Sequence, residues 1–144
     1  MSPATRYTDL TGCRVPVQQA PMGSVSTAAL AVAVAEAGGV GSITTLGMTA
    51  AQLDQVLAGM TARTAGVLAA NFLTADIDPE AVAAAAARVR IVDFFWADPD
   101  PRLVEIAHCG GALACWQVGS ADEARAAAEP AAQIIESWAA VVQH

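Results

Sequence analysis

Val17-Gln18-Gln19-Ala20-Pro21-Met22-Gly23 is the stretch around which the rest of the chain is organised. It reads as a short apolar strand that stops at a proline and opens into a loop of small residues. Pro21 has no N–H to give to a sheet and biases Ala20 toward extended geometry, while Gly23 allows the backbone to approach a flat or bulky group. In α/β proteins, a strand that ends in this way before a helix is a usual place for a ligand. Alone, Pro-Met-Gly is an ordinary turn, so the prediction depends on the segments that follow.

Length and charge limit the class of protein. The chain has 144 residues, 55% of them hydrophobic, and a formal net charge of -7; all seven basic residues are arginines. We therefore expect one domain over residues 1–144 and neither nucleic acid nor an anionic membrane as partner. Residues 28–35, the longest apolar run, are too few to span a bilayer, and no signal peptide is recognisable, which predicts a cytoplasmic protein.

Cys13, Cys109 and Cys115 lack metal-binding spacing and are expected to be reduced and buried.

Strand-like and helix-like segments alternate with a steady period. Helix starts are indicated by Ser26, by a Thr49/Gln52 capping box, by the Asp78-Pro79 and Asp100-Pro101 pairs, and by a Ser120/Glu123 capping box. The expected strands are 16–20, 40–43, 66–71, 91–95, 112–116 and 132–135. Alternation of this kind predicts parallel βα units with right-handed crossovers.

Two α/β architectures fit this order. A doubly wound open sheet is complete with five or six strands, whereas a (β/α)8 barrel needs eight strands and about 250 residues. Strand count alone therefore favours the open sheet.

The residues at the strand ends form an unusual set. Asn71-Phe72, Phe95-Trp96 and Gln117 follow or close three successive strands, so amides stand beside apolar and aromatic side chains. Such a set suits a planar heterocycle that needs a few hydrogen bonds, although each residue also has an ordinary structural explanation. The sequence has no glycine-rich phosphate motif and no metal-ligand spacing.

These residues carry a family resemblance. The segments Gln19–Thr27 and Ala35–Ser42 resemble the opening of the nitronate monooxygenases, formerly called 2-nitropropane dioxygenases, and the similarity continues in register to about residue 120. Its later segments are Asn71-Phe72-Leu73, Phe94–Pro99 and Cys115–Ser120. The family includes the flavin-dependent enoyl-ACP reductases, which share this opening.

The resemblance implies an FMN-binding, TIM-like (β/α)8 barrel of which this chain holds about five and a half to six βα units. It implies that Asn71 and Gln117 hydrogen-bond FMN and that the flavin passes electrons from an alkyl nitronate to dioxygen. The family's base is a histidine after the sixth strand, which places His144 as the catalytic candidate, although the Glu-Ala-Gly-Gly that precedes it in the family is absent here. The segment expected to line the flavin ring consists of Ala20, Pro21, Met22 and Gly23.

Two alternatives stay open at this point. The chain could be a flavin-dependent enoyl-ACP reductase of the same fold, or a noncatalytic, truncated half-barrel. An incomplete parallel sheet leaves open edges, which predicts a homo-oligomer that pairs through them.

Overall fold

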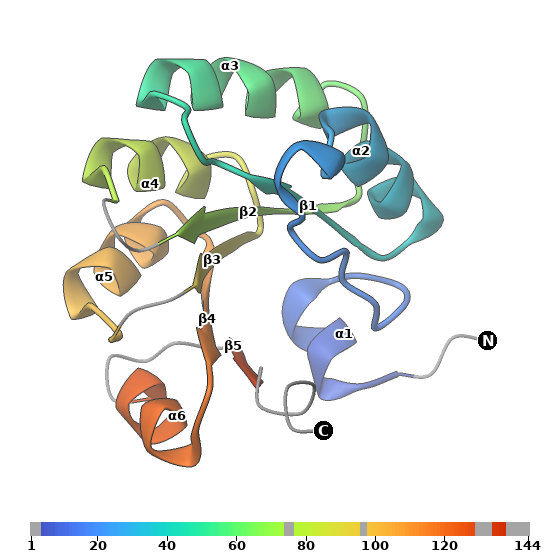
Figure 1. The fold of residues 1–144 in the computed structure, drawn as a ribbon. Helices are drawn as coiled ribbons and strands as arrows, with labels where there is room; N and C mark the ends of the chain where they lie inside the picture. The colour runs from blue at the N-terminus through green and yellow to red at the C-terminus, as the bar shows by residue number, and fades with distance from the viewer. Residues whose placement is uncertain (1–3, 74–76, 96–97, 129–133, 138–144) are drawn as a thin grey trace.

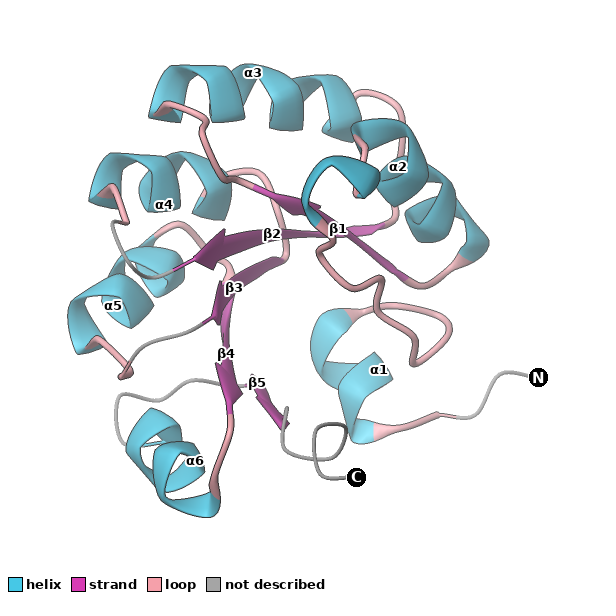
Figure 2. Cartoon of the chain, in the orientation of Figure 1, coloured by secondary structure: helices cyan, strands magenta, loops and turns pink. Residues whose placement is uncertain are grey.

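A computed structural model describes residues 4–73, 77–95, 98–128 and 134–137, and Figures 1 and 2 show the course of the chain. Trp96, residues 132–133 and His144 lie outside the described residues. The helices are α1 (Arg6–Thr11), the 3-10 turn η1 (Gly23–Val25), α2 (Ala28–Ala37), α3 (Ala50–Thr61), α4 (Pro79–Ala86), α5 (Pro101–Cys109) and α6 (Ala121–Ala128). The strands are β1 (Val40–Thr44), β2 (Val67–Leu73), β3 (Ile91–Phe95), β4 (Leu113–Val118) and β5 (Ile134–Ser137).

The strands form a parallel sheet in the order β1-β2-β3-β4-β5, which is the order of the chain. Helices α2 to α6 follow one another around the outer, convex side of this sheet, and α1 lies on the opposite side (Figure 1). The paired segment of β2 moves from residues 67–71 against β1 to 69–73 against β3, and β4 shows a similar shift. Sequential order with a cumulative stagger is what a closing barrel requires. The open-sheet preference from strand counting is therefore wrong, and the fold is an incomplete TIM-type barrel.

The expected first strand is shorter than predicted. Residues 17–19 lie parallel to the start of β1, joined by Gln19 N to Val40 O (2.9 Å) and Val40 N to Val17 O (2.8 Å). Only one isolated bridge, between Gln18 and Val40, forms in this segment. Pro21 stands where the next N–H toward β1 would be and has none to donate, while Val17 N donates to Val15 O (2.8 Å) and not to β1, so the pairing ends on both sides. The other expected strands match the sheet within two residues at each described end, which is the usual uncertainty of element boundaries.

Local sequence signals set most helix ends. Thr49 and Gln52 form the predicted capping box of α3, and Asp78 and Asp100 cap α4 and α5 ahead of a proline. One assignment is wrong, because the N-cap of α2 is Thr27, whose side chain accepts from Leu30 N, and not Ser26.

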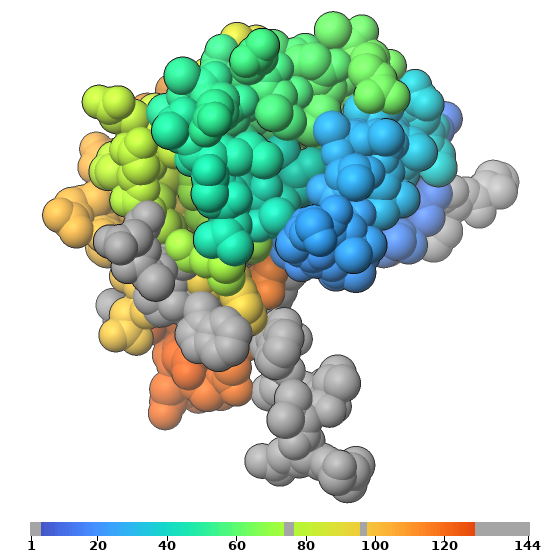
Figure 3. Space-filling view, turned by 45° about the horizontal axis from the view of Figure 1, so that its top comes forward, coloured from blue at the N-terminus to red at the C-terminus, as the bar shows by residue number. Residues whose placement is uncertain are grey.

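The two faces of the sheet bury different side chains. On the outer face, alternate strand residues pack beneath the helices in the main core, with Phe72, Phe94 and Trp116 side by side on neighbouring strands. Helices α2 and α3 lie next to each other over this face (Figure 3). On the inner face, a smaller apolar cluster at the amino ends of the strands packs against Tyr7 and Leu10 of α1. Helix α1 thus closes the bottom of the curved sheet.

Cys13 and Cys115 belong to this inner cluster and are buried, as predicted. Cys109 is exposed, so the prediction that it is buried is wrong; it lies at the last position of α5, beyond the buried face formed by Val104 and Ala107.

In the part of the chain that the structure describes, no helix is long and apolar enough to cross a membrane.

Candidate functional site

A pocket of about 480 Å³ lies at the carboxyl ends of the strands. Each of the first four strands contributes to it near its end, through Thr44, Asn71 with Leu73, Phe95 and Gln117. The remaining wall is the 18–23 segment together with Leu46. In barrels of this type the carboxyl ends of the strands carry the active site, because the loops that follow them converge there.

The structure brings all described cofactor-binding candidates to this one pocket. Its lining includes Ala20, Pro21, Met22 and Gly23 as well as Asn71 and Gln117. Their contact with a flavin is not tested by this arrangement and stays a prediction. The catalytic candidate His144 lies outside the described residues.

The turn over Ala20, Pro21 and Met22 is held by a hydroxyl. Ser26 Oγ accepts a hydrogen bond from Met22 N at 2.7 Å and donates one to Ala20 O at 3.1 Å. Ser26 is buried, whereas Met22 remains 47% exposed. A rigid hydroxyl contact therefore fixes the backbone of the turn while its side chains stay accessible to a ligand.

Asn71 is fixed by its backbone as well as by its side chain. Thr45, which follows β1 directly, donates both its backbone N–H and its hydroxyl to Asn71 O, each at 3.0 Å. Thr45 is buried, and Asn71 is only 3% exposed. The end of β2 is thereby tied to the end of β1 at the floor of the pocket.

Asp93 links the two candidate amides. It lies on β3 in register with Asn71 on β2, faces the inside of the curved sheet and is 0% exposed. Its Oδ2 accepts from Asn71 Nδ2 at 3.1 Å and from Gln117 Nε2 at 2.8 Å. The two amides that the family resemblance assigns to FMN are thus joined to each other through a buried carboxyl group.

Gln19 adds a further polar group to the pocket wall. Its Nε2 donates to Ser42 O at 2.9 Å, while its Oε1 is buried and has no hydrogen-bond partner among the described residues. A buried acceptor without a partner is costly, so this oxygen is suited to a donor supplied by a ligand or water.

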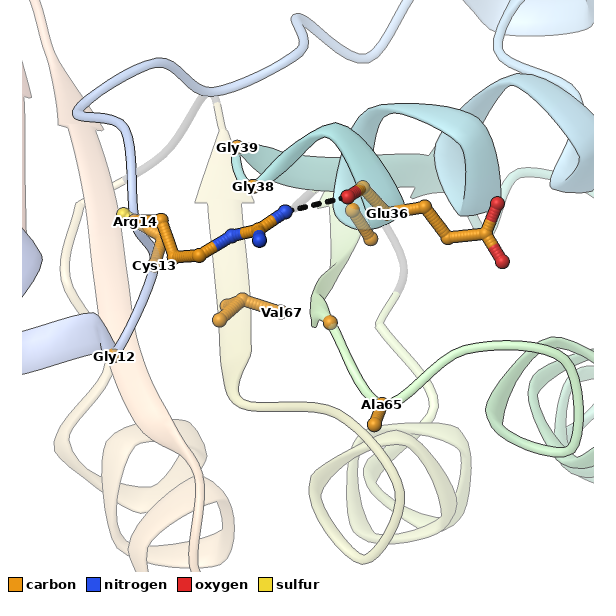
Figure 4. Close-up of a pocket in the computed structure, with 10 residues that line it drawn as sticks. Gly12, Cys13, Arg14, Glu36, Gly38, Gly39, Ala65 and Val67 are labelled. Carbon is orange, nitrogen blue, oxygen red and sulfur yellow. Dashed lines mark hydrogen bonds between the residues drawn. The ribbon is translucent and has the colours of Figure 1, made fainter. Parts of the chain in front are cut away.

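A second, smaller pocket of about 270 Å³ lies at the opposite, amino end of β1 and β2. Figure 4 shows Arg14 reaching across it to the backbone oxygen of Glu36, at 2.7 Å, while the Glu36 carboxylate points away. The other lining residues are small or apolar and include Gly38, Gly39 and Gly66. We assign this region a structural role, because its one arginine is already used to hold the end of α2.

Sequence reasoning missed Ser26 as a clamp, Thr45 as an anchor and Asp93 as the link between the amides. Of these three residues, only Asp93 could have been identified from the sequence, since it is the one charged residue in the apolar strand Ile91–Phe95. Alternation along that strand places it on the same side as Phe95 and Ile91, away from the helices.

Fold and site together define a βα-barrel protein with a ligand pocket at the carboxyl ends of its strands. A family model described as nitronate monooxygenase matches residues 4–83, more than half of the chain. The chain therefore belongs to the nitronate monooxygenase family. No match is found among curated proteins.

Solved structures show the same fold. FabK from Thermotoga maritima is 24% identical, with a TM-score of 0.86 over 93% of this chain and 43% of FabK. A mutant of that FabK gives 25% identity and a TM-score of 0.85 over 92% of this chain and 45% of the mutant. The nitroalkane oxidase from Streptomyces ansochromogenes is 23% identical, with a TM-score of 0.75 over 91% of this chain and 47% of the oxidase. The chain thus spans less than half the length of these proteins.

Proposed function

We propose that this pocket binds the ring system of FMN and that the chain is part of an oxidoreductase that converts alkyl nitronates with dioxygen. The observation that carries the proposal is the meeting of the Ala20–Gly23 turn, Asn71 and Gln117 at one pocket, in a chain of the nitronate monooxygenase family. When bound, FMN supplies the electron transfer from nitronate to dioxygen.

The residues present fit a planar, polar-edged ring. Leu73, Phe95, Pro21 and Met22 provide apolar surface in the lining of the pocket. The same lining holds the Asn71 and Gln117 amides and Gln19, whose Oε1 has no hydrogen-bond partner among the described residues, so it also offers directional hydrogen bonds. A mostly apolar cavity with a few placed polar groups is typical of cofactor sites.

The phosphate of FMN finds no positive partner here. The described residues that line the pocket include no arginine, and the chain has no lysine. We therefore propose that this part of the barrel holds the ring, and that phosphate contacts come from other segments, as in barrels whose phosphate site follows strands seven and eight.

The proposed base is His144, which the family resemblance places near the substrate. Its task would be to hold or move a proton at an imidazole nitrogen beside the nitronate. Loss of nitronate turnover in His144→Ala, with FMN binding retained, is the result expected from this role.

FMN titration of the full chain tests the site. Asn71→Ala and Gln117→Ala should each weaken binding about tenfold or more, because a buried polar group left without its partner costs roughly 1–3 kcal/mol. Gln55→Ala, on the exposed side of α3, is the matched control and should bind as the parent does. Unchanged affinity in both pocket variants would place the site elsewhere.

Turnover assays separate the related functions. Nitronate-dependent oxygen uptake supports the proposal, whereas flavin-dependent oxidation of a nicotinamide with an enoyl thioester supports the enoyl-ACP reductase alternative. A protein that stays colourless after incubation with FMN supports a noncatalytic half-barrel. Self-association through the sheet edges also stays a prediction, and light scattering after size exclusion checks it.

A further inference from the structure

Asp93 occupies the centre of the inner face of the sheet. It is fully buried, and its neighbours in register are Asn71 on β2 and Cys115 on β4. A carboxyl group at such a position is costly unless it is well hydrogen-bonded. Its Oδ2 accepts from both pocket amides, at 3.1 Å from Asn71 and 2.8 Å from Gln117.

These two bonds determine which way each amide is turned. An oxygen that accepts two N–H groups is the unprotonated oxygen of the carboxyl group, whatever the state of the other oxygen. Only the NH2 end of Asn71 or Gln117 can meet it, because an amide oxygen would bring two acceptors together. The usual ambiguity between the oxygen and nitrogen of a side-chain amide is therefore removed at both residues.

The opposite end of each amide is an acceptor. Among the described residues, Asn71 Oδ1 and Gln117 Oε1 have no hydrogen-bond partner, and both residues line the pocket. An amide oxygen is turned about 120° away from the NH2 group on the same carbon, so it cannot also face Asp93.

We propose that Asp93 is a positioning residue that sets the hydrogen-bond polarity of the pocket. By holding the NH2 groups of Asn71 and Gln117, it presents two carbonyl oxygens to the ligand. The ligand edge that meets them must then carry N–H or O–H donors. This inference rests on the proposed function only for the identity of the ligand, since a flavin ring carries an N–H at its pyrimidine edge.

Two substitutions separate this role from simple filling of space. Asp93→Asn keeps an acceptor oxygen and nearly the same shape, so both amides can still be held. Asp93→Leu keeps a similar volume but removes every acceptor, so both amides are free to rotate. Ile91→Ala is the matched control, because Ile91 is fully buried on the same face of β3 but belongs to the apolar cluster below the pocket.

The experiment uses the full chain and two measurements. The first is the set of side-chain NH2 resonances of Asn71 and Gln117 in ¹H–¹⁵N spectra without ligand, and the second is FMN affinity from flavin fluorescence. We expect Asp93→Leu to shift both NH2 pairs and to weaken FMN binding about tenfold or more. Asp93→Asn should stay within about threefold of the parent affinity, and Ile91→Ala should leave the NH2 pairs in place despite lower stability.

A second variant keeps the test decisive if Asp93→Leu does not fold. Gln117 is only half-buried, and Gln117→Glu replaces the NH2 donor by a second carboxylate facing Asp93. At a pH high enough to ionise both carboxyl groups, this variant should bind FMN more weakly than Gln117→Ala, because like charges at hydrogen-bond distance repel. Equal or tighter binding by Gln117→Glu overturns the proposal, as do unshifted NH2 resonances in a folded Asp93→Leu.

Failure of the proposed function gives a different result. If the parent chain does not bind FMN, the flavin assignment is rejected for this chain, and the NH2 resonances alone decide the role of Asp93. If the parent binds FMN and Asp93→Leu binds it equally well, the flavin assignment stands and the positioning role is rejected.

Discussion

The inner and outer faces of the sheet are built from adjacent residues of the same strands. Asn71, Asp93 and Cys115 stand in register on the inner face, and the next residue of each strand, Phe72, Phe94 and Trp116, stands in register on the outer face. The outer three are aromatic, with ring centroids 6.1 Å apart for Phe72 and Phe94 and 4.7 Å for Phe94 and Trp116. The inner three include the amide and carboxyl group of the candidate site.

This comparison separates stability from binding. Aromatic side chains bury large apolar areas and stabilise the contact between sheet and helices. The polar residues on the other side contribute less to stability, because their hydrogen bonds replace bonds to water. Substitutions on the two faces should therefore affect different measurements.

The largest effect is expected on the outer face. Phe94 is fully buried between Phe72 and Trp116, so Phe94→Ala should cost about 3–5 kcal/mol of unfolding free energy, from lost burial and a cavity. Urea unfolding followed by circular dichroism measures the loss. A cost below about 1 kcal/mol would show that the aromatic row does not stabilise the sheet.

A smaller effect is expected at the turn that borders the pocket. Ser26→Ala removes the acceptor for Met22 N and the donor for Ala20 O, which should lower stability by about 0.5–1.5 kcal/mol. FMN affinity should fall about three- to tenfold, because the turn becomes less ordered. Ser24→Ala, an exposed serine of the same turn, is the control and should change neither measurement. If the two variants have equal stability and equal FMN affinity, the Ser26 hydroxyl does not hold the turn of the candidate site.

A weaker effect still is expected from changing the ligand. Since no arginine lines the pocket, the full chain should bind riboflavin within about threefold of FMN. Parallel fluorescence titrations at low salt measure the ratio. A clear preference for FMN would mean that a positive group outside the described pocket reaches the phosphate.

The smallest effect is expected on the exterior, at the ion pair between Asp54 of α3 and Arg88, which follows α4. The hydrogen bond from Arg88 lowers the pKa of Asp54 below its ordinary value of 3.8. The unfolded state therefore binds the proton more readily, so the pair stabilises the protein above pH 3.8, and this contribution is lost as the pH falls through the lowered pKa.

The side chain of Asp54 is 45% exposed, so Asp54→Asn should lower stability only slightly at pH 7. The difference from the parent should vanish in high salt and below the lowered pKa. Thermal unfolding at two salt concentrations and two pH values checks this. A difference that persists in high salt would contradict a purely ionic contribution.

Features that depend on a few neighbouring residues were predictable from the sequence. The Thr49/Gln52 capping box and the Asp78-Pro79 helix start are examples, because their hydrogen bonds join residues two or three positions apart. Grouping Asn71 with Gln117 was predictable as well, since both stand at the ends of parallel strands.

Features that depend on distant pairing were harder to predict. Strand counting did not reveal the curvature, because the stagger of a barrel accumulates over several strand pairs and leaves no local signal. Asp93 was missed because its partners lie 22 and 24 residues away along the chain. Ser26 was assigned to a helix cap because serine is common there, and the neighbouring Thr27 takes that position instead.

The alternation of polar and aromatic residues also has a consequence for how the sheet assembles. If β3 slipped by one residue against β2, Asp93 would face the helix layer and Phe94 would face the amides. Such a sheet would be penalised twice, once for a carboxyl group among apolar helices and once for two amide groups without an acceptor. The polar residues of the pocket thus disfavour a shifted register of β3 against β2. The register that completes the site is also the one in which the strands are correctly aligned.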